Sequence, residues 1–290
     1  NLDIQLNPSS KIIEDIIIRD KNSRKQAFNR IKTKHVVLIP GGNTGVETIL
    51  KTLPGVSSAN ELSSQYSVRG GNFDENMVYV NGIEVYRPFL VHSGQQEGLS
   101  FVNSDMVENI LFSAGGFESK YGDKMSSVLD ITYKTPTKNK ASLQMSLLGG
   151  SAHFEGITSN NKFSYLFGFR NKSNQYLLNA MDTRAEYKPN FSDVQTYLKY
   201  QLKDNWIISF LGNISQNKYR MIPENRDTEF GTLNEALKLR IFFEGQESDQ
   251  YNTYFGALNT SISPNLKTKL NFTTSAFKTI ESESFDILGE

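Results

Sequence analysis

Apolar and polar residues alternate one by one along most of the second half of the chain. Between residues 162 and 170 the apolar positions are Phe163, Tyr165, Phe167 and Phe169. The same period of two recurs in five further segments, which begin near residues 141, 193, 206, 254 and 266. A tight reversal at Gly149 and Gly150 leads into another strand near 152–158. Because alternation is typical of strands with one apolar and one hydrophilic face, the pattern predicts seven β-strands after residue 140.

The connections between these strands alternate in length. Beyond the first reversal, short turns at Ser159–Asn161, Lys203–Asn205 and Ser263–Asn265 take turns with long excursions at Asn171–Asn190 and about Asn217–Gln250. The segment Leu237–Phe243 is predicted to be a hairpin arm inside the second excursion. Soluble β-sandwiches also alternate, but they have no reason to place every long loop at one end. Outer-membrane barrels place their long loops at the extracellular end and their short turns at the periplasmic end.

Seven strands do not close a membrane barrel. Unpaired strand edges in hydrocarbon cost several kcal/mol for each backbone group, roughly the cost of any unmatched polar group in lipid. We therefore expect the sequence to be a fragment that carries about seven strands of a larger barrel, of the plugged 22-stranded kind.

The first half of the chain predicts a small α+β domain. The segment Val36–Ile39 reads as a buried strand, and Thr44 with Glu47 reads as a capping box that opens a helix ending at Pro54. Strands are predicted at Tyr66–Arg69, Asn109–Ser113 and Val128–Lys134, with a short helical turn capped by Ser104. Asn81 and Gly82 tolerate the positive φ angles of a two-residue turn, so residues 77–86 predict a hairpin.

Composition excludes several classes of function. The 31 basic and 31 acidic residues balance, which argues against a nucleic-acid binder, and the absence of cysteine excludes thiolate metal sites and cysteine nucleophiles. Three scattered histidines give no metal site, and no serine lies in a nucleophile turn. We therefore expect no enzyme, no catalytic residue, no metal and no cofactor. The aromatic residues divide into 11 before residue 141 and 22 after it, so the strand-rich half is the aromatic half.

The motifs of the first half resemble the plug domain of TonB-dependent outer-membrane receptors. They occur in the family's order between residues 46 and 137, as VETILKTLPGV, QYSVRGG, NMVYVNGIEVY and MVENILFSAGGFESKYGDKMSSVLDITYKTP. The sequence departs from the family at Asn81, where Asp is frequent, and at Ser126 and Ser127, where a glycine pair is frequent. The run YRPFLVHSGQQEG at residues 86–98 looks like receptors of Bacteroidetes-type bacteria.

The resemblance implies a domain organisation and a location. Residues 1–34 would be the end of an N-terminal extension with the TonB-interacting segment and a linker, residues 35–137 the plug domain, and residues 138–290 the N-terminal part of the barrel. The protein would lie in the outer membrane, with the plug inside the barrel lumen and the N-terminal segment in the periplasm.

The resemblance also implies a function. Receptors of this family actively import a scarce nutrient across the outer membrane, here a siderophore-, corrinoid-, glycan- or peptide-like compound, while the plug gates the lumen. The implied partners are TonB with its inner-membrane energising proteins, the nutrient ligand and outer-membrane lipid, with a surface lipoprotein left open and no nucleic acid. The alternatives are a non-transporting plug-barrel scaffold for binding, adhesion or secretion, and a soluble all-β binding module, against which the aromatic outward face argues.

Two sets of candidate site residues follow from the resemblance. The TonB-interacting segment would be Glu14, Asp15, Ile16, Ile17, Ile18 and Arg19, where an apolar run suits strand addition to a partner's sheet, unless it is the last core strand of a preceding domain. The ligand-binding candidates at the plug apex are Arg69, Asn72, Tyr86, Arg87, Phe89 and Gln95. For Arg69 we favour a structural ion pair between plug and barrel over ligand contact, and Phe89 has a core position as its alternative.

Overall fold

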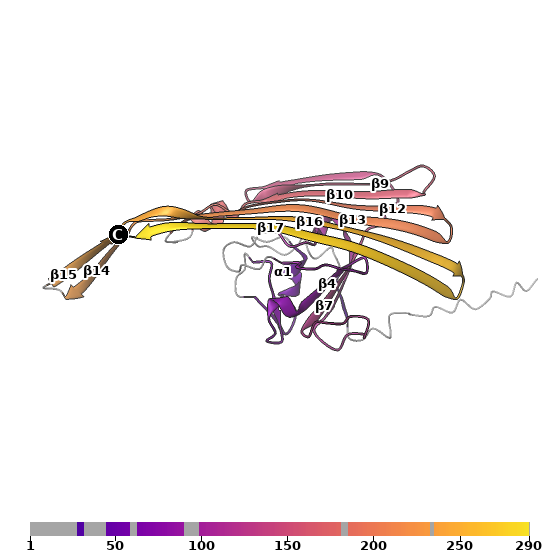
Figure 1. The fold of residues 1–290 in the computed structure, drawn as a ribbon, viewed down its shortest axis with the longest axis horizontal. Coiled ribbons are helices and arrows are strands. Elements are labelled where there is room, and N and C mark those ends of the chain that lie inside the picture. The colour runs from indigo at the N-terminus through magenta and orange to yellow at the C-terminus, as the bar shows by residue number, and fades with distance from the viewer. Residues whose placement is uncertain are drawn as a thin grey trace, which may run out of the picture.

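The computed structural model describes residues 28–31, 45–58, 63–89, 99–180, 185–232 and 235–289. A small domain from the first half packs against one face of a long antiparallel sheet from the second half (Figure 1). The predicted strand at Val36–Ile39 lies outside the described residues. Among those residues, no helix is long and apolar enough to cross a membrane.

The small domain is built on a mixed sheet of five strands in the order β1-β6-β7-β4-β5. These strands are β1 (Asn29–Ile31), β4 (Asn76–Val80), β5 (Ile83–Glu84), β6 (Val107–Ser113) and β7 (Ser127–Tyr133). The pair β4 and β7 is parallel and the other neighbours are antiparallel. Among its described residues, the domain also contains a short strand pair, β2 (Val56–Ser57) with β3 (Ser67–Val68), and a helix, α1 (Val46–Leu50). Two 3-10 turns are described as well, η3 (Phe73–Glu75) and η4 (Ser104–Met106).

Several local predictions for the small domain are confirmed. Asn81 and Gly82 have φ angles of 53° and 76° and join β4 to β5, as the hairpin prediction requires. Gly55, which follows the predicted end of the helix at Pro54, has a φ angle of 80°. The strands predicted at Asn109–Ser113 and Val128–Lys134 are β6 and β7 with bounds shifted by one or two residues.

Two predicted helix caps are wrong. The helix α1 begins after Gly45, which makes no side-chain cap, and Glu47 is buried instead of reaching back to the helix start. Thr44 lies outside the described residues. In η4 the cap is Asn103, whose side chain accepts a hydrogen bond from the Asp105 amide at 3.1 Å, so Ser104 is inside the turn. The helix begins one residue later than the predicted capping box requires, and tertiary burial of Glu47 overrides the local pattern.

The long sheet confirms the seven predicted strands. Their order is β17-β16-β13-β12-β10-β9-β8, every neighbouring pair is antiparallel, and a short strand β11 (Ala185–Tyr187) pairs with the end of β13. The strands are β8 (Lys140–Ser146), β9 (Gly149–Ile157), β10 (Phe163–Lys172), β12 (Asn190–Lys203), β13 (Trp206–Pro223), β16 (Phe243–Asn265) and β17 (Thr268–Gly289).

The short turns that follow β9, β12 and β16 gather at one end of the sheet, on the right in Figure 1, while the tight turn between β8 and β9 lies at the other end. At the other end lie helix α2 (Gln175–Asn179) and a hairpin of β14 (Arg226–Thr232) and β15 (Glu235–Ile241), which projects beyond the sheet (Figure 1). The hairpin confirms the arm predicted near Leu237–Phe243. The excursion predicted at Asn217–Gln250 is too long, because β13 continues to Pro223 and β16 begins at Phe243. The alternation of Tyr219 and Met221 with Lys218 and Arg220 marks the end of β13, and the prediction ended the strand too early.

The two faces of the long sheet are covered unequally. On β12 the apolar Val194 is 49% exposed, while its polar neighbours Asp193 and Gln195 are 3% and 0% exposed beneath the small domain. Ile214 on β13 is likewise 58% exposed. The apolar face of the sheet therefore points away from the protein, and part of its hydrophilic face is buried against the small domain.

Candidate functional site

The contact between the small domain and the long sheet is centred on a buried ion pair. Arg170 of β10 and Asp193 of β12 stand directly opposite each other in the register of the two strands and are 7% and 3% exposed. The Arg170 Nε atom donates to Asp193 Oδ1 at 2.9 Å, and its Nη2 atom donates to Asp193 Oδ2. The planar guanidinium fits a carboxylate in this two-bond arrangement, which fixes its orientation.

Arg170 also binds the backbone of the small domain. Its Nη1 atom donates to the carbonyl of Val102 at 2.7 Å, and its Nη2 atom donates to the carbonyl of Ser100 at 2.9 Å. One side chain of the long sheet thus holds a loop of the small domain in place. Because the ion pair is buried, removal of either partner would leave an uncompensated charge, a change that costs about 3–5 kcal/mol.

A buried carboxyl lies beside this ion pair. Glu47 of α1 is 1% exposed, and burial raises its pKa, although a hydrogen bond with Ser100 and the positive charges of Arg170 and Lys51 act in the opposite direction. Within the described residues its Oε2 atom has no hydrogen-bond partner. A buried carboxyl that lacks a full set of partners favours its protonated form.

Two further contacts flank the ion pair. The Tyr133 hydroxyl at the end of β7 donates to Gln195 Oε1 at 2.5 Å, and the Gln195 amide donates to the carbonyl of Phe101 at 3.1 Å. The Phe101 ring meets the Phe255 ring of β16 edge-on, with centroids 5.2 Å apart. Polar groups of the small domain therefore form hydrogen bonds with the hydrophilic face of the sheet. Aromatic contacts extend the hydrophobic core of the small domain into the sheet.

Close approach of the two bodies depends on a glycine in β10. A Cβ atom added at Gly168 would lie 2.2 Å from the Asn103 Nδ2 atom and 3.2 Å from the Met106 sulfur, both in the η4 region of the small domain. Only a residue without a side chain lets this turn rest on the strand.

A second contact joins the small domain to β17. The Arg87 guanidinium donates to Glu281 Oε1 at 2.7 Å, and the Tyr86 ring meets Phe277 edge-on with centroids 5.5 Å apart. Both members of the ion pair are about two-fifths exposed. Loss of this exposed pair is expected to cost less than loss of one partner of the buried pair, because exposed ion pairs contribute about 0–1 kcal/mol to stability.

The comparison with family models matches the small domain. Residues 31–128 match the family described as TonB-dependent Receptor Plug Domain. These residues form a plug domain. No curated protein matches the sequence.

The comparison with solved structures concerns the fold of plug and sheet together. The siderophore receptor PirA from Acinetobacter baumannii has 12% sequence identity and a TM-score of 0.51, over 88% of this chain and 44% of that one. A variant of the ferric enterobactin receptor PfeA from Pseudomonas aeruginosa has 15% identity and a TM-score of 0.51, over 89% and 46%. The chain spans about half the length of the structures it matches, and its fold is a plug domain followed by antiparallel barrel strands.

The predicted ligand residues do not form one cluster with the ion pair. Arg69 is exposed with a φ angle of 50°, and its side chain lies beside Gly55 and Gly115 of the plug domain. Asn72 caps the η3 turn by accepting from the Phe73 amide at 2.9 Å. These contacts are local to the plug domain.

The remaining predicted residues divide between the barrel contact, the core and the undescribed part of the chain. Tyr86 and Arg87 contact β17, as described above. Phe89 is 7% exposed and packs edge-on against Tyr66, with ring centroids 5.4 Å apart. Gln95 and the segment Glu14–Arg19, predicted to contact TonB, lie outside the described residues.

Sequence reasoning missed the residues that hold the plug domain to the barrel strands. Alternation puts Asp193 and Gln195 on the hydrophilic face of their strand but predicts no contact for them, the pattern assigned Glu47 to a helix cap, and it gave Arg170 no role. One signal in the sequence could have indicated this contact, because Arg170 is a charged residue at the end of a strand rich in aromatic residues. In the described part of the chain, no cluster of three metal-ligating side chains is present.

Proposed function

We propose that this protein is part of a TonB-dependent importer of the outer membrane, in which the plug domain closes the lumen of a barrel that begins with β8. The observation that carries the proposal is the buried pair of Arg170 and Asp193 on the barrel wall, which binds the plug backbone at Ser100 and Val102. These directional polar contacts, together with the aromatic contact of Phe101 with Phe255, hold the plug against the wall.

The finer parts of the proposal come from sequence. Residues Glu14–Arg19 are proposed to pair with TonB in the periplasm, and the end of the sheet that carries α2 and the β14–β15 hairpin is proposed to face the cell exterior. The plug domain, whose sheet includes β1, is proposed to extend to residue 137 and the barrel strands to begin at 138. The proposed substrate is a scarce nutrient too large for passive entry. Of the two solved structures described above, one is a siderophore receptor and the other a ferric enterobactin receptor, which supports this class of cargo.

Deletion of Glu14–Arg19 in the full-length protein tests the proposal. Without a segment for TonB to grasp, uptake of the nutrient is expected to be lost while binding to purified protein stays within about twofold. A matched control deletes the six residues 5–10, which are mostly polar and precede the proposed segment.

Two outcomes would contradict the proposal. Unchanged uptake after deletion of Glu14–Arg19 would exclude TonB coupling through this segment. Binding of the ligand by the intact protein, without any accumulation in cells that carry TonB, would favour the scaffold alternative for binding, adhesion or secretion.

A further inference from the structure

The outward face of the long sheet changes from apolar to polar toward the end that carries α2. On β13 the outward positions are apolar from Trp206 to Ile214, a length of about 26 Å at about 3.3 Å per residue. This length is close to the height of about 25 Å that the apolar band of a membrane barrel has. The next outward row consists of Asn171, Ser192, Gln216, Asn252 and Ile280. The apolar band of β13 therefore ends at Ile214.

Basic side chains stand at this boundary and beyond it on the same outward face. Lys278 on β17 lies in the cross-strand row of Ile214, and Lys218 and Arg220 follow on β13, four and six residues farther along. All three basic residues are exposed. The Arg220 Nε atom donates to Gln246 Oε1 at 2.5 Å. In the part of the chain that the structure describes, neither Lys218 nor Lys278 forms an ion pair.

The two faces of the sheet carry opposite charges at this level. On β13, β16 and β17, the outward rows of Gln216, Lys218 and Arg220 contain no acidic residue among the described positions. Lys188 lies beside Arg220 but is paired with Glu186 at 3.1 Å. The inward positions between these rows are acidic, and they include Glu247, Asp249, Glu281 and Glu283. The sheet therefore presents positive charge on its outward face and negative charge on its inward face.

The three outward cations cover a range of heights above the apolar band. Lys218 and Arg220 lie about 13 and 20 Å beyond Ile214 along the strand, and a strand tilt of about 40° reduces these heights to about 10 and 15 Å. Lys278 stays at the level of Ile214 itself. Long basic side chains can lie along apolar surface while their charged ends stay in a polar layer. The three charges therefore reach the layer in which the headgroups of a membrane lipid lie.

We propose that Lys218, Arg220 and Lys278 bind the phosphate groups of the glycolipid in the outer leaflet of the membrane. Phosphate oxygens accept charge-assisted hydrogen bonds from guanidinium and ammonium groups, which are the groups that this surface presents. An acidic partner protein would instead need an apolar centre to bury, and the three outward rows on β13, β16 and β17 offer only Ile280.

The choice of leaflet rests on the proposed function, which puts the α2 end of the sheet at the cell exterior. Near the turns that follow β12 and β16, alternation places Lys199 and Lys269 on the inward face instead. The outward cations therefore meet the leaflet at the α2 end. Phosphatidylglycerol has a phosphate as well, so the experiment compares it with lipopolysaccharide, the phosphorylated glycolipid.

The test is binding of fluorescently labelled, diphosphorylated lipopolysaccharide to the delipidated full-length protein in neutral detergent, with a chelator present to remove divalent cations. The triple variant Lys218→Gln, Arg220→Gln, Lys278→Gln is expected to bind about a hundredfold more weakly at low salt, because each basic residue near an anionic membrane surface contributes about fivefold. The charge-preserving variant Lys218→Arg, Arg220→Lys, Lys278→Arg is expected to stay within about threefold of the parent.

A matched control removes three lysines near the turns at the other end of the sheet. The variant Lys162→Gln, Lys199→Gln, Lys269→Gln changes the net charge by the same amount and is expected to leave the affinity within about twofold of the parent. Heat-modifiable migration checks that each variant is assembled. Enzymatically dephosphorylated lipopolysaccharide is tested on the parent protein, which needs no substitution, and is expected to bind as weakly as the first triple variant.

Four results would overturn the inference. They are no binding of lipopolysaccharide by the parent, equal binding by the parent and the first triple variant, an equal loss in the control variant, and tight binding of the dephosphorylated lipid. Phosphatidylglycerol bound as tightly as lipopolysaccharide would overturn the assignment to the outer-leaflet glycolipid. Lipid binding by purified protein needs neither TonB nor a nutrient. The inference can therefore fail while uptake stands, and uptake can be independent of Glu14–Arg19 while lipid binding stands.

Discussion

At the scale of single residues, burial of Glu47 is expected to make the stability of the folded protein depend on pH. Burial raises the pKa of this carboxyl above its ordinary value of 4.5. The folded state therefore binds the proton more tightly than the unfolded state does. The stability that the protonated Glu47 carboxyl contributes to the folded state is fully present below pH 4.5. It is lost as the pH rises through the raised pKa, because the carboxyl must then ionise inside the interface.

Glu47→Gln is expected to remove this dependence. The neutral amide imitates the protonated carboxyl, so the variant should gain stability at neutral pH relative to the parent and match it near pH 4.5. Each unit of pKa elevation corresponds to about 1.4 kcal/mol. Thermal unfolding of the full-length protein in detergent between pH 4 and 8 measures the effect, with Glu108→Gln, at an exposed position of β6, as the control. A parallel pH profile in parent and Glu47→Gln would refute the assignment.

At the scale of elements, the hairpin of β4 and β5 is joined to β7 by its turn residue. Asn81 has a φ angle of 53°, and its Oδ1 atom accepts a hydrogen bond from the Tyr133 amide at 2.9 Å. Its backbone amide also donates to the carbonyl of Ile131 at 2.8 Å. The side chain thus serves both the turn and the exit strand that leads to the barrel.

Asn81→Ala is expected to lower the free energy of unfolding by about 1–3 kcal/mol, since it leaves the Tyr133 amide without its acceptor and puts alanine at positive φ. Asn81→Asp keeps an acceptor oxygen and tolerates the same backbone angle, so it is expected to stay close to the parent. Chemical denaturation followed by aromatic fluorescence compares the two. Equal losses in both variants would show that the side-chain acceptor does not matter.

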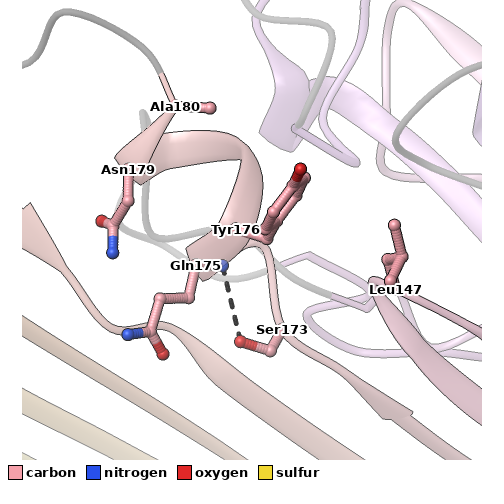
Figure 2. A pocket seen from close by; sticks show the side chains of 6 residues that line it. All are labelled: Leu147, Ser173, Gln175, Tyr176, Asn179 and Ala180. Carbon is pink, nitrogen blue, oxygen red and sulfur yellow. Dashed lines mark hydrogen bonds between the residues drawn. The ribbon is translucent and has the colours of Figure 1, made fainter.

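Elements with a local signal could be predicted from sequence, and contacts between distant elements could not. The turn at Asn81 and Gly82 and the alternation in β10 and β12 are properties of neighbouring residues, so the pattern located them. The hydrogen bonds from Arg170 to the carbonyls of Ser100 and Val102 join residues about 70 positions apart. Leu147 and Tyr176 line the same hollow beside α2 only because β9 and β10 pair between them in the chain (Figure 2).

At the scale of the whole molecule, the usual arrangement of apolar and polar faces is reversed. Phe169, Val194, Ile214 and Tyr254 form one cross-strand row on four successive strands of the sheet, and each is 45–58% exposed. The opposite face carries Asp193 and the other polar groups that bind the plug domain. A sheet with this arrangement is suited to lipid on its outside and to a polar plug on its inside.

Placing a charge in the apolar row tests this arrangement. Val194→Arg is expected to cost about 2–4 kcal/mol at the centre of a bilayer, because the guanidinium must be taken out of water. The matched control is Asn271→Arg on β17, which alternation places on the opposite, exposed face of the sheet. Heat-modifiable migration of the full-length protein, extracted from bacterial outer membranes, reports the assembled fraction. We expect Val194→Arg to lower this fraction severalfold and Asn271→Arg to leave it unchanged. Full assembly of Val194→Arg, or an equal defect in both variants, would mean that the exposed apolar row does not face lipid.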